Sequence, residues 1–283
     1  MRSDFVVLIL SHGRPDRVWT IESLRRAGYT GRIVIVVDNE DERQQDYLRL
    51  YKNDVYVFDK LEESKHTDTM DQRLDRRIVV YARNKCHDIA KQLGYKYFLV
   101  LDDDYVNYRQ RYEDDSGVLR TRYVRDFDAL VDVTLDFLVE SGATSVAWAQ
   151  TGDFISGKNS AVWKDKIRRK AMNAFFCCVD KPFKFIGSIN EDVNAYCVLG
   201  QRGELFFTVR DICVDQTQTQ SNAGGLTDAY KNLGTYIKSF YSVMCCPSFV
   251  KVSTMGVSEH RFHHNINWNN AVPKIISSKY RKE

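Results

Sequence analysis

The sequence predicts an α/β protein with a mostly parallel central sheet and helices on both faces. Three observations support this fold class. The first hundred residues contain four short, almost entirely apolar segments, which is typical of strands buried on both faces. A helical segment separates each of these segments from the next, as parallel strands require. Polar residues follow every segment, so a ligand-binding edge is expected at the carboxyl ends of the strands.

The elements of the N-terminal half follow from this alternation. Its helices have apolar residues three or four positions apart, and Gly28 and Gly94 stop two of them. The longest helix has Ile78, Ala82 and Cys86 on one side. In chain order we expect strand 5–10, helix 16–27, strand 33–37, helix 41–51, strand 55–58, a polar loop over 60–75, helix 76–93 and strand 97–101.

The C-terminal half is less regular, and its elements are predicted from shorter patterns. No internal repeat or low-complexity linker divides the chain, so we predict one domain over residues 1–283. The expected elements are helix 127–140, strands 145–149 and 174–179, helix 190–199, strand 205–209, helix 228–241 and a last strand at 249–253.

Composition and charge exclude several classes of protein. The chain is 43% hydrophobic and 28% charged, as soluble globular proteins are. No apolar run is long enough to cross a bilayer and no signal peptide is recognised, so we expect a cytoplasmic protein that does not contact a membrane. Its seven cysteines are odd in number and form no C-x-x-C pair, which predicts reduced, buried thiols.

The net charge of +3 argues against a protein that binds nucleic acid over its whole surface. Basic residues nevertheless cluster at 120–125, 164–170 and 279–282. Such runs are usually solvated surface, but they would contact phosphates if the substrate were a polyanion.

Three consecutive carboxylates, Asp102, Asp103 and Asp104, follow the fourth predicted strand. Like charges held together are unfavourable unless a cation neutralises them. Side chains alternate in an extended segment, so Asp102 and Asp104 would share a ligand while Asp103 faces elsewhere. Two carboxylates with open positions suit Mg²⁺ or Mn²⁺. The alternative is a solvated acidic turn.

These motifs, the turn at 11–15, Arg83-Asn84 and the acidic triplet, resemble the GT-A fold of the nucleotide-diphospho-sugar transferases. The resemblance implies a donor-binding half at residues 1–104 and an acceptor-binding half at 105–283. It implies that the donor is a UDP-sugar, held together with the divalent metal. The resemblance implies contacts with the uracil and ribose by Ser11, His12, Gly13, Arg14 and Asp38. It places Arg83 at the diphosphate or the neighbouring acids. Asp102 and Asp103 would contact the donor, and Asp102 and Asp104 would bind the metal.

A second acidic motif, Glu191-Asp192, opens the helix expected at 190–199 and follows Gly187. It resembles the GT-A segment that supplies the catalytic carboxylate, and the resemblance implies Asp192 and Glu191 as catalytic residues, with Asp192 as the base. The alternative is a helix cap, with Asn190 as the cap residue and both acids at the positive end of the helix dipole.

Histidines cluster near the C-terminus at His260, His263 and His264. GT-A enzymes often complete their metal site with a C-terminal histidine, and the resemblance therefore implies His264 as a third ligand. If the segment were helical, His260 and His264 would share a face. An exposed polar loop is the alternative.

The segment 216–225 is polar, uncharged and ends in two glycines, which is typical of a disordered surface loop or of a loop that binds an acceptor. Together with the other motifs it resembles the TET/JBP-associated glycosyltransferases, a family common in bacterial viruses. The resemblance implies transfer from UDP-glucose or UDP-N-acetylglucosamine to 5-hydroxymethylcytosine, or a related hydroxymethylpyrimidine, in DNA. The implied acceptor-binding residues are Gln216, Gln218, Gln220, Asn222, Gly224 and Gly225.

Three other functions remain open at this point: a GT-A transferase acting on a glycan or protein hydroxyl, a nucleotidyltransferase, and a binding module without activity. The absence of a glycine-rich phosphate loop with a lysine after the first strand argues against the second. The intact set of acidic and basic residues argues against the third.

Overall fold

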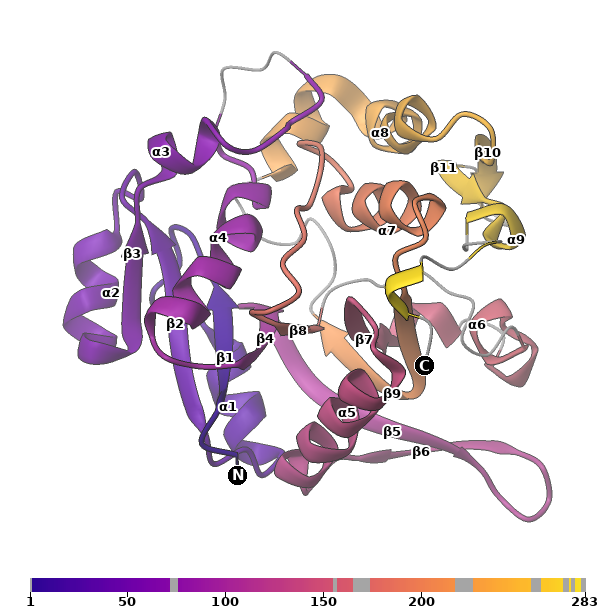
Figure 1. Ribbon diagram of the computed structural model, residues 1–283, viewed down its shortest axis with the longest axis horizontal. Coiled ribbons are helices and arrows are strands. Elements are labelled where there is room, and N and C mark those ends of the chain that lie inside the picture. The colour runs from indigo at the N-terminus through magenta and orange to yellow at the C-terminus, as the bar shows by residue number, and fades with distance from the viewer. Residues whose placement is uncertain are drawn as a thin grey trace.

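A large sheet forms the centre of the computed structural model, which describes residues 2–71, 76–154, 157–164, 174–216, 226–255, 261–271, 275 and 278–280 (Figure 1). Within these residues the sheet has nine strands in the order β3-β2-β1-β4-β8-β7-β9-β5-β6. The strands are β1 (Phe5–Leu10), β2 (Arg32–Asp38), β3 (Val55–Phe58), β4 (Tyr97–Asp102), β5 (Tyr105–Glu113), β6 (Leu119–Tyr123), β7 (Ser145–Gln150), β8 (Phe175–Cys178) and β9 (Phe206–Gln216).

The four N-terminal strands are parallel, as predicted. β1 lies between β2 and β4, and β2 also pairs with β3. The register places Leu10 opposite Asp102 and Asp38 opposite Phe58, so these strands end at one edge. The residues that follow each strand are therefore neighbours in space, which the alternation of strands and helices had predicted.

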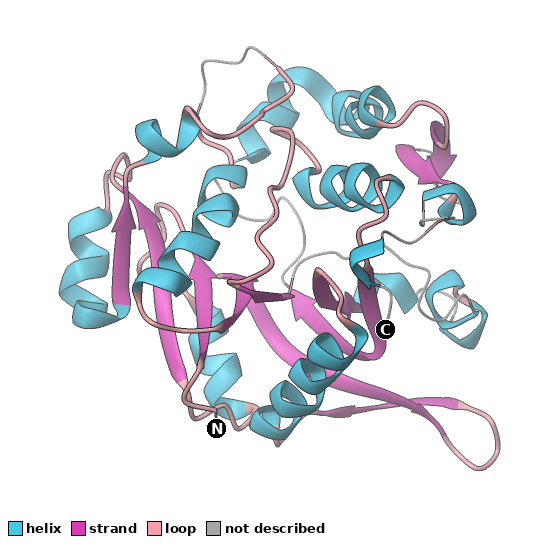
Figure 2. Ribbon diagram, in the orientation of Figure 1, coloured by secondary structure: helices cyan, strands magenta, loops and turns pink. Residues whose placement is uncertain are grey.

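Helices cover both faces of the sheet (Figure 2). On one face, β1 contributes Phe5, Val7 and Ile9 to a core that α1 (Trp19–Arg26) and α5 (Phe127–Ser141) complete. On the other face, the alternate β1 residues meet α4 (Val80–Gln92) and α7 (Glu191–Gln201). The period-two alternation of one fully apolar strand thus feeds two cores, and the predicted α/β class is confirmed.

The C-terminal half of the sheet is mixed in direction. β8 is antiparallel to both β4 and β7, whereas β7 and β9 are parallel. β5 is antiparallel to β9 and forms a hairpin with β6. The remaining elements are α2 (Gln44–Tyr51), α3 (Lys60–Ser64), α6 (Ala161–Lys164), α8 (Leu226–Cys245), α9 (Trp268–Ala271), the 3-10 helices η1 (Lys52–Asp54), η2 (Thr151–Phe154), η3 (Gly157–Asn159) and η4 (Ser278–Tyr280), and a two-stranded sheet of β10 (Val250–Met255) and β11 (Arg261–Ile266).

Several sequence predictions were wrong in detail. The loop expected at 60–75 begins with α3, because the Asp59 side chain accepts a hydrogen bond from the Glu62 amide and caps that helix. The β5–β6 hairpin was not predicted, because its polar, arginine-rich strands show no apolar alternation. The strand expected last, at 249–253, is followed by β11, so the idea of a helix joining His260 and His264 is wrong, and His260 lies outside the described residues.

The state of the cysteines and the character of the helices agree with the predictions made from composition. All seven cysteines are free, and all but the partly buried Cys245 are buried. Among the helices of the described residues, none combines the length and apolar character that a bilayer span requires.

One buried histidine in α4 makes the fold sensitive to acid. His87 is 8% exposed and packs edge-on against Phe98 and Phe183, and neither ring nitrogen has a hydrogen-bond partner in the described part of the chain. Burial, aided by the positive charge of Lys184, lowers the pKa of His87 from 6.5 to about 4. The folded state therefore favours the neutral imidazole, because burying the charged ring costs free energy.

We expect His87→Phe to flatten the dependence of stability on pH. The folded-state pKa is depressed, so the stabilisation is complete above pH 6.5 and is lost as the pH falls toward 4, by about 3 kcal/mol at most. Urea unfolding of both proteins at pH 7.5 and at pH 5 measures this difference. His66→Gln, at an exposed position, is the control. Equal losses of stability in wild type and His87→Phe would contradict the interpretation.

Candidate donor and acceptor site

The polar edge of the parallel strands contains a buried carboxylate that supports the turn after β1. The Asp103 carboxylate accepts hydrogen bonds from the Ser11 hydroxyl at 2.5 Å and the Arg14 guanidinium at 2.8 Å. The Tyr47 hydroxyl lies 2.6 Å from the Ser11 hydroxyl and accepts from the Arg14 amide. Burial raises the pKa of Asp103 to about 6 against the effect of Arg14. Asp103 is 1% exposed and therefore fixes Arg14. Its predicted contact with the donor stays a prediction.

A second cluster surrounds Asp38 at the end of β2. Its two carboxylate oxygens lie 2.9 Å from His12 Nδ1 and 2.9 Å from Lys60 Nζ. Burial alone would raise the pKa of Asp38, but the hydrogen bonds from His12 and Lys60 lower it. The Gly13 amide donates to Asp41 at 2.6 Å with a φ of +71°, which favours glycine at this turn. The residues predicted for uracil and ribose are thus together, and they share one hydrogen-bonded network.

The third cluster joins two segments that are far apart in the sequence. Arg83 of α4 is 3% exposed, and its guanidinium lies 3.1 Å from Asp102 at the end of β4 and 2.8 Å from Glu191 at the start of α7. The rings of Phe175 and Phe185 lie beside the guanidinium, at 5.6 and 5.8 Å. Burial alone would lower the pKa of Arg83, but the neighbouring carboxylates raise it above its ordinary value. Of the two predicted roles of Arg83, this structure shows the contact with acidic neighbours.

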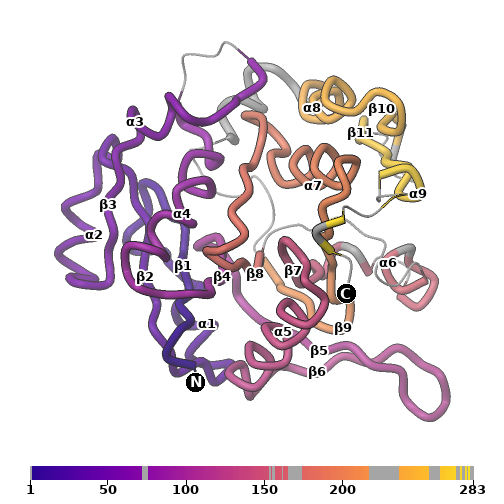
Figure 3. The backbone as a smooth tube through the Cα atoms, in the orientation of Figure 1, coloured from indigo at the N-terminus to yellow at the C-terminus, as the bar shows by residue number. Residues whose placement is uncertain are grey.

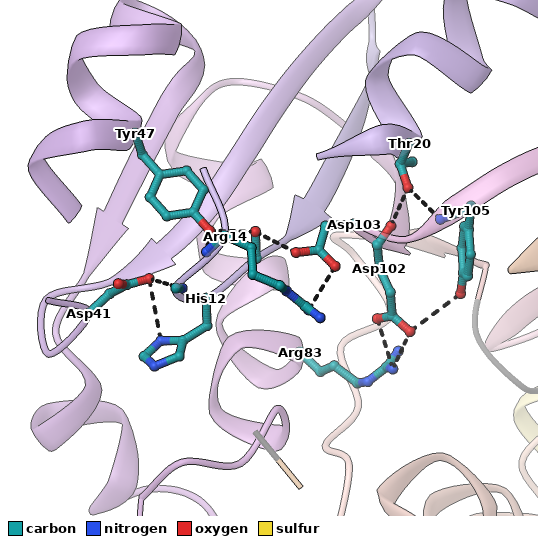
Figure 4. A network of polar contacts seen from close by, with 11 residues as sticks. His12, Arg14, Thr20, Asp41, Tyr47, Arg83, Asp102, Asp103 and Tyr105 are labelled. Carbon is teal, nitrogen blue, oxygen red and sulfur yellow. Dashed lines mark hydrogen bonds and ion pairs between the residues drawn. The ribbon is translucent and has the colours of Figure 1, made fainter. Parts of the chain in front are cut away.

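Asp102 and Asp103 point to opposite sides of the chain, as alternation predicts (Figure 4). The Asp102 carboxylate turns toward Arg83 and lies 3.4 Å from the Tyr105 hydroxyl, whereas Asp103 turns toward Arg14. The turn itself is fixed from α1, because Thr20 Oγ1 donates to the Asp102 carbonyl and accepts from the Tyr105 amide. Asp104 is partly buried at the end of this turn.

The carboxylate pair at the start of α7 divides into a buried and a more accessible group. Glu191 is 5% exposed, and burial raises its pKa to about 7 against the opposing effect of Arg83. Asp192 is only partly buried, and its charge contributes to the shifts of both Glu191 and Arg83. Asp192 therefore lies close to this ion pair and is less buried than Glu191.

Hydrogen bonds involving three helices hold the loop that leads into α7. Asn84 of α4 pairs with the Phe185 backbone, accepting from its amide at 2.7 Å and donating to its carbonyl at 3.1 Å. Asn194 of α7 donates to the carbonyls of Ile186 and Ile189. Asn190 occupies the N-cap position, but its side chain donates to the Lys238 carbonyl of α8. The prediction of a side-chain cap at Asn190 is therefore wrong, although both acids do lie in the first turn.

Other predicted residues lie elsewhere or outside the described residues. His264 is buried in β11, opposite Val252, and stacks on His263. In the described part of the chain, no three His, Cys, Asp or Glu side chains are close enough to hold a metal ion together. Gln216 ends β9 opposite Tyr105, beside the acidic triplet. The predicted acceptor residues that the structure does not describe are Gln218, Gln220, Asn222, Gly224 and Gly225.

Sequence reasoning missed four supporting residues: Thr20, Tyr47, Lys60 and Tyr105. Each reaches the site from an element whose own pattern is helical or extended and carries no motif. Only the tertiary packing of these elements against the strand ends brings them to the site, so no local signal marks them.

Comparison with known proteins identifies the family. The model of the TET-associated glycosyltransferases matches residues 5–225, which contain all three clusters. The chain belongs to this family. As a TET-associated glycosyltransferase it has the predicted GT-A type of fold, with the acidic triplet at the end of the fourth strand. No curated protein matches the chain.

Several solved structures resemble this TET-associated glycosyltransferase at low identity. Residues 1–349 of TarS from S. aureus, in complex with UDP, have 12% identity and a TM-score of 0.44, over 76% of this chain and 60% of that one. Glucosyl-3-phosphoglycerate synthase from Mycobacterium tuberculosis, with Mn²⁺, UDP and phosphoglyceric acid, has 9% identity and a TM-score of 0.48, over 93% and 86%. The mannosyltransferase PcManGT from Pyrobaculum calidifontis, with GDP-Man and Mn²⁺, has 12% identity and a TM-score of 0.49, over 86% of this chain and 65% of that one. The chain thus spans about three fifths of the TarS fragment.

We expect Arg83→Met to destabilise the fold by about 3–5 kcal/mol, because it leaves Asp102 and Glu191 without their buried cation. Combining it with Glu191→Met should restore part of the loss, since one unpaired charge is then removed. Chemical unfolding measures both effects. Arg49→Met, which removes an exposed guanidinium paired with Asp46, should change stability by less than about 1 kcal/mol. If Arg83→Met and Arg49→Met lowered the free energy of unfolding by similar amounts, the buried ion pairs of Arg83 would not be needed for stability.

Proposed function

We propose that this chain transfers a sugar from a UDP-sugar, UDP-glucose or UDP-N-acetylglucosamine, to the hydroxyl of a 5-hydroxymethylpyrimidine in DNA, with 5-hydroxymethylcytosine as the first candidate. Membership of the TET-associated glycosyltransferases supports the class of reaction. The observation that carries the proposal is the Asp102–Arg83–Glu191 bridge, because it joins the expected donor site to the expected catalytic helix.

The donor side of the proposal rests on the first two clusters. Asp38, Asp41 and the Gly13 turn form a polar edge whose groups could hydrogen-bond to a uracil and a ribose diol. Arg14, fixed by Asp103, presents a guanidinium that is 30% exposed. A planar guanidinium beside this edge suits the oxygens of a diphosphate.

The residues of the turn also fit a divalent cation. Mg²⁺ and Mn²⁺ are commonly held by one or two carboxylates and completed by substrate phosphates and waters, so a cage of three protein ligands is not required. Asp104 and Asp102 would hold the ion, which neutralises the charge that develops on the leaving UDP. His264 remains a predicted third ligand.

The acceptor side rests on α7 and β9. In an inverting transfer, Asp192 would accept the proton of the acceptor hydroxyl. The hydroxyl oxygen would bond to the anomeric carbon as the bond from that carbon to UDP breaks. Glu191 is occupied by Arg83 and would orient the helix, although it was predicted within the catalytic pair. Because β9 ends opposite Tyr105, the acceptor segment that starts at Gln216 leaves the sheet beside the triplet.

Transfer to DNA is the direct test. Wild-type protein with a UDP-sugar and Mn²⁺ should add one hexose to nucleosides released from duplex DNA that contains 5-hydroxymethylcytosine, as measured by mass spectrometry. Unmodified DNA should gain no mass, because it lacks the acceptor hydroxyl. No addition with either UDP-sugar would refute the proposed acceptor or donor, and assays with free glycans would then separate the two.

Asp104→Asn should weaken Mn²⁺-dependent UDP binding by more than about 100-fold, since even groups that only orient a metal ligand contribute 10–100-fold. Calorimetric titration with UDP, with and without Mn²⁺, measures the change. Asp136→Asn removes an equal charge at an exposed position of α5 and should bind as wild type does. Wild-type affinity in Asp104→Asn would remove this residue from the metal site.

Asp192→Asn should lower the rate of transfer by about 10²–10⁴-fold, the usual contribution of a general base, and should leave UDP binding intact. Single-turnover assays and UDP titration on the same preparation separate these effects. If the variant transfers sugar at the wild-type rate, Asp192 is not the base and only stabilises the N-terminus of α7.

A further inference from the structure

The β5–β6 hairpin has an unusual distribution of charge. Residues 105–112 and 119–125, which comprise β6, the two residues after it and all of β5 except Glu113, contain five arginines and no carboxylate. The acids of the hairpin lie together at its far end, at 113–115. Figure 3 shows the hairpin extending from the sheet at the lower right, so these arginines form a basic ribbon at the sheet edge.

One face of this ribbon is open. The register places Gln110 opposite Arg122 and Tyr112 opposite Arg120, so these four side chains share a face. Tyr112 is 41% exposed, and the Arg122 guanidinium lies over its ring. The opposite face is covered, because Arg111 lies over the Phe154 ring and Glu113 accepts a hydrogen bond from the Trp163 indole.

The open face continues into a cleft of about 150 Å³ between α1 and the root of the hairpin. Two arginines, Arg26 and Arg125, line this cleft together with Ser23, Asn107 and Tyr123, and no acid does. Tyr108, also in the lining, is buried and lies on the same face of β5 as Gln110 and Tyr112, so the cleft and the open face follow one another along the hairpin.

Three arginines of this strip, Arg26, Arg122 and Arg125, have no carboxylate partner within the described residues, whereas Arg120 pairs with Asp114. Arg26 donates to the Val106 carbonyl and the Asn107 amide oxygen, and Arg122 donates to the Gln110 amide oxygen. Arg125 is exposed and its side chain forms no hydrogen bond or ion pair within the described ranges. Several other surface arginines do pair with acids, as in Arg2–Asp4, Arg43–Asp16, Arg49–Asp46 and Arg76–Glu40.

We infer that this strip, from Arg26 and Arg125 through Arg122 to Arg120, binds the phosphodiester backbone of the acceptor DNA duplex. The inference rests on the proposed function for the choice of partner. Arginine is suited to phosphate because its planar donors match two oxygens at once. The Arg120–Asp114 pair is solvent-exposed and therefore weak enough to exchange for a phosphate.

The position of the strip agrees with a duplex partner. Asn107 follows Asp104 by three residues of extended chain, so the cleft begins about 10 Å from the acidic triplet. The strip runs about 17 Å along the strands, or roughly five base-pair steps of 3.4 Å. One strand thus carries the predicted metal site at its start and the phosphate contacts along its length.

The other candidate occupant of this edge is a second copy of the chain paired to β6. Edge strands do pair with other chains, but arginines on an edge oppose this by like-charge repulsion. The charge therefore favours a polyanion over self-association.

The test measures binding to a short duplex by fluorescence anisotropy at several salt concentrations between roughly 50 and 200 mM. Arg26→Gln, Arg122→Gln and Arg125→Gln should each weaken binding about threefold to tenfold and reduce the salt slope by about one. Arg49→Gln, with the same loss of charge on α2, should keep the wild-type slope. The Arg125 side chain forms no hydrogen bond or ion pair in the described part of the chain, so Arg125→Gln is expected to fold. This variant tests the inference if Arg26→Gln does not fold.

The outcomes separate this inference from the proposed function. Reduced slopes in a protein that transfers no sugar would support the DNA-binding strip and refute the transfer. Wild-type slopes in all three variants of a protein that does glycosylate DNA would overturn the strip alone. A change in sedimentation without a change in slope would show that β6 pairs with another copy, and wild type that binds no duplex would overturn both proposals.

Discussion

The burial of one arginine between two carboxylates is the constraint on which the site depends. Removing a guanidinium from water costs several kcal/mol, and Arg83 recovers this only because Asp102 and Glu191 both contact it. Those acids belong to elements far apart in the chain, so the ion pairs fix the position of α7 against the parallel sheet. Uncharged side chains at this point would not hold two carboxylates at the edge where the parallel strands end.

The other contacts of the site repeat this arrangement on a smaller scale. Asp103 holds Arg14, and Asp38 holds both His12 and Lys60. In each case a buried aspartate fixes side chains at the strand ends, of which Arg14 and His12 are partly exposed and Lys60 is buried. The acids predicted to bind ligand therefore divide into two kinds: those that support a cation, such as Asp103 and Glu191, and those with more access, such as Asp104 and Asp192.

The sequence predicts the N-terminal half well because its strands are apolar throughout and end in polar motifs. The triplet, the 11–14 turn and Asp38 meet because parallel register forces them to the same edge. The hairpin was missed because both of its faces are polar, and α3 because its cap, Asp59, lies in a charged stretch without periodicity. Tyr47 and Thr20 could not be predicted from local pattern, since only tertiary packing aims them at the site.

The hydrogen bonds of Thr20 have a consequence for how a cofactor is gained and lost. Thr20 is fully buried, and its hydroxyl links the carbonyl of Asp102 to the amide of Tyr105 across the turn that contains Asp103 and Asp104. The backbone of that turn is thus ordered by protein contacts alone. A cation arriving there would meet ligands whose conformational entropy has already been lost, and its departure would not melt the turn. Binding and release of such a cation would then be a reversible equilibrium decoupled from folding, and removing it with a chelator would leave the protein folded.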